Sequence, residues 1–221
     1  MERRTQADTM IGLEVVEQLC SRICHDLAGP VGAIRNGLEL MEEAEEGEPA
    51  GGQALDLIGH SADLAARRVR LFRLAYGRST RDGVRGFADL REAALDWLSG
   101  GRVTLQWPPG QPADTLAPRP GLAKLLINLV ILAAEAIPQG GVLSVAAGGS
   151  PEAGWASVTA AGRGVKWPAE LTAALAAPLE GEALGPRTVQ AVMTGRFASH
   201  HGLALTPETP DPETLVFTVR W

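Results

Sequence analysis

The residues best able to do chemistry form one short run, Cys24-His25-Asp26-Leu27-Ala28-Gly29-Pro30. On a helical wheel with Ile23 at 0°, the neighbouring apolar residues fall between about −40° and 80°, whereas His25 falls at about 200°. The imidazole is therefore expected to project into solvent from the middle of a helix. An exposed imidazole is largely neutral at cellular pH and can attack an electrophilic phosphoryl group. We expect His25 to be a nucleophile and Asp26 to orient its ring or accept its proton.

The solvent-facing side of this helix carries small residues beside the histidine. Gly29 and Gly32 each cost a helix about 1 kcal/mol relative to alanine, and Pro30 lacks the amide that would bond to the carbonyl of Asp26. Small side chains leave a flat place where the backbone of another protein can approach. We therefore expect a docking surface around the histidine, formed by Ser21, Arg22, Ala28, Gly29, Gly32, Arg35 and Asn36.

The histidine and its neighbours allow three other interpretations. His25 could be an ordinary surface histidine, which is the commoner case for a lone histidine. A metal site of Cys20, Cys24 and His25 would need a fourth ligand, and Cys24 lies about 100° around the helix from His25. Haem attachment requires two residues between the cysteines, but here there are three. We expect no metal and no cofactor bound by this chain, and we assign no chemistry to His60, His200 or His201.

Two long helices are expected to position the histidine. Residues 10–46 have apolar side chains at steps of three and four, and an acidic run followed by Pro49 ends the pattern. From Leu55 to Tyr76 the apolar residues alternate three and four apart, which is a heptad seam. A second line runs beside it, at Leu57, Leu64 and Leu71. Because one partner helix can hardly cover both lines, we predict a helical hairpin that pairs with a second copy into a four-helix bundle.

The second half of the chain has a different pattern. Turn-forming residues at 77–83 indicate a linker, so we predict a hairpin domain at 1–80 and an α/β domain at 84–221. A proline-rich loop is expected at 108–120. Helices are expected at Phe87–Leu98, Gly121–Ile137 and Thr188–Ser199, and strands at Val103–Trp107, Val142–Ala146, Trp155–Thr159 and Leu215–Val219. Helices that interleave with hairpin-like strand pairs predict an α+β layer sandwich.

Composition and charge limit the possible functions. The 221 residues carry a formal net charge of −6 and a pI near 5.3, which argues against nucleic acid or an anionic membrane as the main partner. The most apolar stretch, Leu122–Ile137, is interrupted by Lys124, Asn128 and Glu135 and is too short to span a bilayer. Two cysteines form no disulfide framework, and the N-terminus lacks the apolar core of a signal peptide. We therefore expect a cytoplasmic protein.

The segment from Cys24 to Leu40 closely resembles the phosphoacceptor helix of the ChpT-type histidine phosphotransferases, and more distantly the dimerisation domain of sensor histidine kinases. The helical hairpin and the α/β half extend this likeness over nearly the whole chain. The resemblance implies a homodimer that acts in a bacterial phosphorelay. In it, His25 receives a phosphoryl group from one receiver-domain aspartate and passes it to another. The implied partners are the receiver domains of a hybrid histidine kinase and of response regulators.

The second half resembles a degenerate form of the ATP-binding domain of these kinases. In the segment similar to the asparagine box Asn128 is kept, but Leu132 replaces the second asparagine, which would hold Mg²⁺. Ala160 stands where a carboxylate would bind adenine, and the later glycine box is reduced to Gly185-Pro186-Arg187. We therefore expect no ATP-dependent kinase activity, and we expect Mg²⁺ to come from the partner receiver domain. The alternatives are an ATP-dependent histidine kinase with divergent motifs and a non-catalytic pseudokinase scaffold that binds response regulators.

Overall fold

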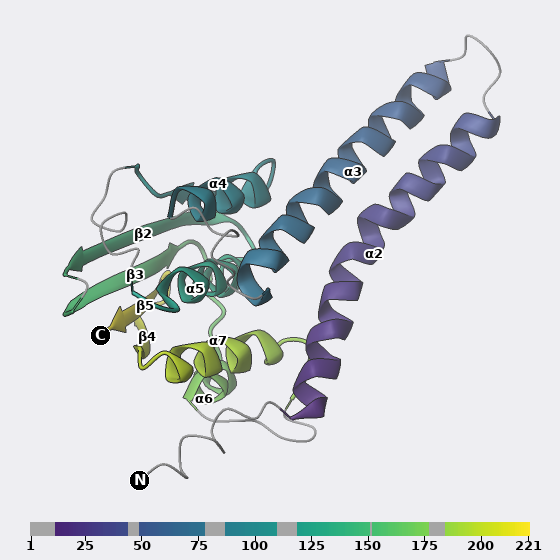
Figure 1. Ribbon diagram of the computed structural model, residues 1–221. Helices are drawn as coiled ribbons and strands as arrows, with labels where there is room; N and C mark the ends of the chain where they lie inside the picture. Colours follow the sequence, from purple (N-terminus) through teal and green to yellow (C-terminus); the bar gives the residue numbers. More distant parts are fainter. Residues whose placement is uncertain (1–11, 44–48, 78–86, 110–118, 151, 177–183) are drawn as a thin grey trace.

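The computed structural model describes residues 12–43, 49–77, 87–109, 119–150, 152–176 and 184–221. Two long helices, α2 (Leu13–Glu43) and α3 (Pro49–Tyr76), run antiparallel and project from the rest of the molecule as a hairpin (Figure 1). The predicted hairpin is therefore confirmed, with α3 beginning six residues before the predicted seam. The expected linker after residue 77 and most of the expected proline-rich loop lie outside the described residues.

Close packing holds the two helices of the hairpin together near their outer end. Gly37 of α2 is buried against α3, where a Cβ atom would lie 2.6 Å from Cγ1 of Ile58 and 3.2 Å from the carbonyl oxygen of Ala54. Glycine at this position therefore lets the two helices approach more closely than any other residue would allow. Ala54 and Ser61 of α3 are also buried, at 1% and 4% exposure.

The apolar residues of the hairpin are only partly covered within one chain. Val31 and Leu38 of α2, together with Leu55 and Val69 of α3, are exposed. Leu71, in contrast, is fully buried in the core that α3 shares with the second half of the chain. The second apolar line on α3 therefore does not reach solvent at Leu71, because the chain's own second half covers it.

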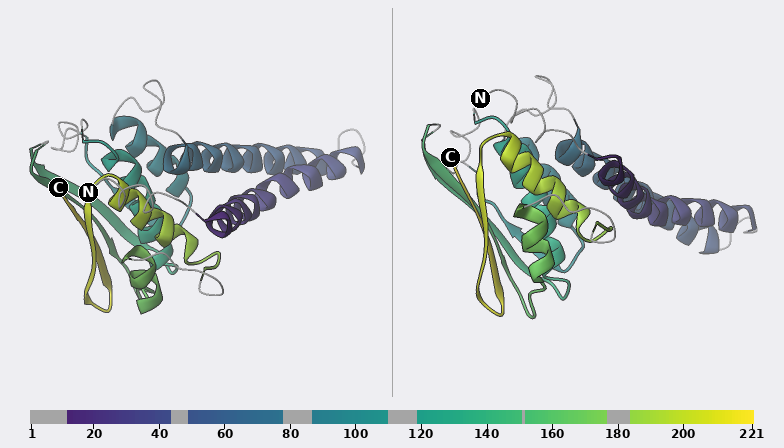
Figure 2. Two further views of the ribbon diagram at one scale, coloured as in Figure 1. Left: turned by 60° about the horizontal axis from the view of Figure 1, so that its bottom comes forward. Right: turned by 90° about the horizontal axis from the view of Figure 1, so that it is seen from below.

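The second half of the chain is a sheet with helices packed on one face (Figure 2). The helices are α4 (Phe87–Leu98), α5 (Leu122–Ala136), α6 (Ala169–Ala176) and α7 (Val189–His200). The strands are β1 (Val103–Gln106), β2 (Gly141–Gly149), β3 (Gly154–Ala161), β4 (Ala204–Asp211) and β5 (Thr214–Arg220). The strand order is β1-β2-β3-β5-β4, with β1 parallel to β2 and the other neighbours antiparallel. The predicted α+β layer sandwich is confirmed.

The main core lies between this sheet and its helices. Alternate residues of β2, β3 and β5 are buried there, as Leu143, Val158 and Phe217 illustrate, because successive side chains of a strand point to opposite faces. The sequence pattern missed α6, which has eight residues, and β4, which contains Pro207 and Pro210. Proline is tolerated in β4 because it is an edge strand.

The hairpin is joined to the second half over a broad contact. Val15 of α2 and Leu71 and Ala75 of α3 belong to the same buried cluster as the core of the second half. Arg70 of α3 also forms ion pairs of 2.8 Å with Glu92 and with Asp96 of α4. In the part of the chain that the structure describes, no helix is long and apolar enough to cross a membrane.

Candidate functional site

His25 lies in the middle of α2, with 89% of its side chain exposed. Its Nδ1 atom is 3.5 Å from Oδ1 of Asp26, within hydrogen-bonding distance. The predicted solvent-facing imidazole is confirmed, and the neighbouring carboxylate is placed to bond one ring nitrogen. With Nδ1 facing Asp26, the other ring nitrogen, Nε2, is free to act as the nucleophile.

Arg68 of α3 stabilises the turn of α2 that carries the histidine. Pro30 has no amide hydrogen, so the carbonyl of Asp26 lacks its normal helical donor four residues on. The guanidinium of Arg68 donates a hydrogen bond to this carbonyl oxygen, and α2 continues without interruption to Glu43. Sequence reasoning identified the missing donor but not Arg68, because Arg68 lies 42 positions away on the other helix.

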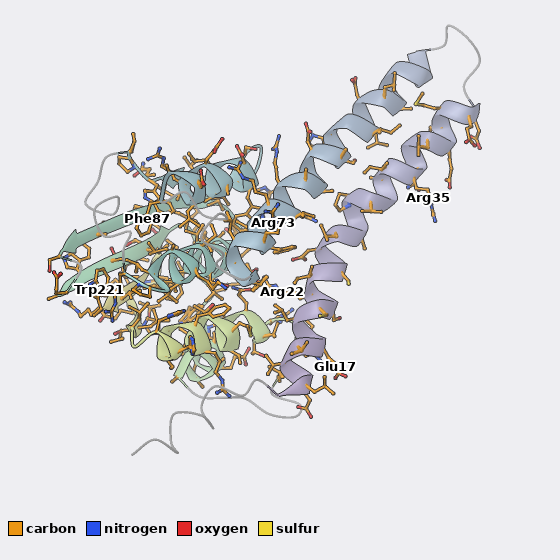
Figure 3. All side chains as sticks on the ribbon, viewed as in Figure 1. Glu17, Arg22, Arg35, Arg73, Phe87 and Trp221 are labelled. Carbon is orange, nitrogen blue, oxygen red and sulfur yellow. The ribbon has the colours of Figure 1, made fainter. Side chains whose placement is uncertain are left out.

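The surface of α2 beside His25 is open at two glycines, in agreement with the prediction from the small residues. At Gly29 and at Gly32, nothing lies within 4 Å of the position that a Cβ atom would take. Arg35 is 77% exposed and forms an ion pair of 3.4 Å with Glu39, and it points away from the second half of the chain (Figure 3). Ser21, Ala28 and Asn36 are exposed on the same helix. Another protein can therefore approach the backbone of α2 directly next to the histidine.

A cleft of about 660 Å³ lies between α2 and the second half of the chain. Ser21, Arg22, His25 and Asp26 line it from α2. The facing wall includes Glu135, Lys166, Pro168, Glu170, Pro186 and Arg187. The imidazole thus borders a concave surface with charges of both signs, which residue spacing along α2 could not predict.

Arg22 differs from the other predicted docking residues. Only 10% of its side chain is exposed. Its guanidinium bonds the carboxylate of Glu135 and, at 3.2 Å, the carbonyl oxygen of Pro186, and the side chain lies between α2 and the second half (Figure 3). Dehydration raises the pKa of Glu135, and the positive charge of Arg22 limits this rise. Arg22 therefore connects the two sides of the cleft instead of standing free on the surface of α2.

Three of the positions that resemble nucleotide-binding motifs, Asn128, Leu132 and Ala160, are buried inside the protein. Asn128 is fully buried and donates hydrogen bonds to the carbonyl oxygens of Ala75, at 3.0 Å, and Lys124, at 2.7 Å. Its side-chain oxygen accepts a hydrogen bond of 2.8 Å from Gln190. Leu132 and Ala160 are buried, at 2% and 0% exposure. Among the described residues, no group of three or more histidine, cysteine, aspartate or glutamate side chains is placed to hold a metal ion.

The chain is similar to known proteins over most of its length. Residues 87–213 match the family model described as the histidine phosphotransferase C-terminal domain. The chain is 32% identical to the protein phosphotransferase ChpT of Brucella abortus (strain 2308), over 90% of this chain and 91% of that protein. A solved structure of a bacterial phosphotransferase superposes with a TM-score of 0.76 and 31% identity, covering 96% of this chain and 98% of the other. The chain therefore belongs to the ChpT-type histidine phosphotransferases.

Proposed function

We propose that this chain carries phosphoryl groups between the aspartates of receiver domains, with His25 as the intermediate acceptor. The observation that supports this most is the placement of His25. Its imidazole is 89% exposed, next to two glycines that leave the helix backbone open and beside a cleft. A partner of domain size can bring a phosphorylated side chain to such an imidazole without moving any part of α2.

The chemistry follows from the two ring nitrogens. The carboxylate of Asp26 lies 3.5 Å from Nδ1 and favours the tautomer in which Nδ1 carries the proton. In that tautomer the lone pair of Nε2 attacks the phosphorus of an aspartyl phosphate. As the nitrogen–phosphorus bond forms, the bond from phosphorus to the aspartate oxygen breaks, and its electron pair remains on that carboxylate. The positive charge that develops on the imidazole is stabilised by the carboxylate of Asp26. Transfer to the next receiver is the reverse of this step.

The docking surface would have two sides. One is the small-residue surface of α2, with Ala28, Gly29, Gly32, Arg35 and Asn36, and the other is the part of the second half that faces the cleft. The receivers of a hybrid histidine kinase and of response regulators are the proposed partners, and the receiver would bring Mg²⁺ to its own phosphorylated aspartate. The metal would neutralise charge on the phosphoryl group during transfer.

A second copy of the chain is the proposed partner for the exposed apolar side of the hairpin. Val31 and Leu38 on α2 and Leu55 and Val69 on α3 are between 44% and 57% exposed, and Leu55 and Val69 are separated by two heptads. Pairing two such hairpins would bury these residues in a four-helix bundle. Cys20 and Cys24 are both free thiols and exposed, which is compatible with a reducing compartment, and we propose the cytoplasm.

The proposal is tested by phosphoryl transfer from purified phosphorylated receivers. The unmodified chain should gain a label that is stable in base and labile in acid, and His25→Gln should gain none. His60→Gln is the matched control, because His60 is an exposed histidine of the same hairpin. Circular dichroism should show both variants folded, since surface substitutions usually change stability by less than about 0.5 kcal/mol. Labelling of folded His25→Gln would contradict the proposal.

A further inference from the structure

Helix α5 carries three polar residues on a surface that is otherwise apolar. Eleven of its fifteen residues are buried, yet Lys124, Asn128 and Glu135 interrupt the apolar sequence. At 100° per residue these three lie within about 40° of one another around the helix axis. They form a single stripe, which we call the α5 polar stripe.

Each residue of the α5 polar stripe binds the hairpin. The Lys124 amine donates to the carbonyl oxygen of Gly77, directly after α3. Asn128 donates to the carbonyl oxygen of Ala75 in the last turn of α3. Glu135 pairs with Arg22 on α2 and lines the cleft beside His25. The stripe therefore contacts α3 at one end and α2 at the other.

A third element holds the centre of the stripe in place. Gln190 of α7 is fully buried, donates to the side-chain oxygen of Asn128 and accepts a hydrogen bond from the hydroxyl of Tyr76 on α3. A buried carboxamide with unmet hydrogen bonds is costly, so this network favours one relative position of α3, α5 and α7.

We infer that the α5 polar stripe fixes the second half of the chain against the hairpin. The cleft beside His25 therefore has the shape that fits a receiver even when no receiver is bound. Asn128 is then a positioning residue. It touches neither the imidazole nor the cleft, but it lies two turns from Glu135 on the same side of α5. A rotation or tilt of α5 would displace Glu135 from Arg22 and change the wall that faces His25. This inference rests on the proposed function.

Loosening the stripe should weaken receiver binding without changing the reactivity of the imidazole. If the binding-competent arrangement falls to a tenth of the population, the apparent affinity falls by the same factor. Asn128→Leu keeps a side chain of similar size and removes all three hydrogen bonds. Tyr76→Phe removes only the hydroxyl that binds Gln190. Leu126→Ala is the matched control, because Leu126 is equally buried but lies about 180° around α5 from the stripe.

The experiment measures KM and kcat for transfer from a phosphorylated receiver, and separately the rate at which phosphoramidate, a small donor that needs no docking, labels His25. We expect Asn128→Leu to raise KM about tenfold and Tyr76→Phe about threefold, with kcat and the phosphoramidate rate unchanged. We expect Leu126→Ala, tested at a temperature where it is folded, to keep the native KM.

Two results would overturn the inference: a native KM in folded Asn128→Leu, or an equal rise in Leu126→Ala, which would show a general effect of lost stability. If Asn128→Leu does not fold, the KM of Tyr76→Phe decides, and a native value there overturns the inference. Failure of the unmodified chain to accept a phosphoryl group from any receiver would overturn the proposed function as well, which distinguishes the two failures.

Discussion

Replacing Gly32 by arginine should obstruct the docking of a receiver without destabilising the chain. Gly32 lies seven residues after His25, which places it on the same side of α2 and about 10 Å along the helix axis. Nothing lies within 4 Å of the position that a Cβ atom would take there. Side chains on a helix point towards its N-terminus, so the new guanidinium would extend back over Ala28 and Gly29 towards the imidazole. The flat approach to His25 would then be obstructed by a long charged side chain.

The structure predicts that this substitution raises the stability of the chain and lowers the rate of phosphoryl transfer. Because the Cβ position is open, the exchange should stabilise α2 by about 1 kcal/mol, the difference in helix propensity between glycine and arginine. For a chain of this size, that corresponds to a rise in Tm of roughly 2–4 °C. Obstruction of the docking surface should lower the transfer rate at subsaturating receiver by at least about tenfold, or about 1.4 kcal/mol.

The assay combines thermal unfolding with the rate of phosphoryl transfer from a phosphorylated receiver. Gly52→Arg is the matched control, because Gly52 is also a helical glycine with nothing within 4 Å of its Cβ position, and it lies at the outer end of the hairpin. It should not slow transfer, and because an added cation in the first turn of α3 is unfavourable, little or no gain in stability is expected. If Gly32→Arg transfers at the native rate to every receiver that the native chain accepts, the docking surface has been misplaced.

Four further predictions concern helix packing, assembly, the pH dependence of stability and nucleotide binding. Gly37→Ala should destabilise the chain by about 1–3 kcal/mol in urea unfolding, because the new methyl group would lie 2.6 Å from Cγ1 of Ile58; an increase in stability would refute this packing argument. Val69→Glu should convert a dimer to monomers in light scattering, since each buried valine contributes about 1.5–3 kcal/mol; an unchanged mass would exclude this surface. Burial raises the pKa of Tyr76 to about 12, so the stabilisation from the protonated hydroxyl is complete below pH 10 and is lost between pH 10 and 12. In urea titrations, the free energy of unfolding of the native chain should therefore fall by about 2 kcal/mol more over that interval than that of Tyr76→Phe. Equal losses in the two proteins would refute this. Calorimetry with ATP and Mg²⁺ should detect no saturable binding, whereas submillimolar Mg²⁺-dependent affinity would favour the kinase alternative.

The sequence by itself predicted the parts of this protein that depend on neighbours along the chain. Steps of three and four residues placed His25 opposite the apolar side of its helix, and the structure shows the side chain 89% exposed. The helix Phe87–Leu98 was predicted with both of its ends correct. Such features follow from contacts between residues three or four apart, which a single sequence displays directly. In α6 and β4, short length and prolines obscured the same signal.

The tertiary structure alone decided which polar side chains act together. In the sequence, Asn128 was one interruption of an apolar segment and a remnant of a nucleotide motif. Its hydrogen-bond partners Ala75 and Gln190 lie 53 and 62 positions away, and Arg22 meets Glu135 across 113 positions. No local periodicity encodes such distances, because they depend on how the hairpin packs against the sheet and its helices. The cleft beside His25 and the inward position of Arg22 arise from that packing.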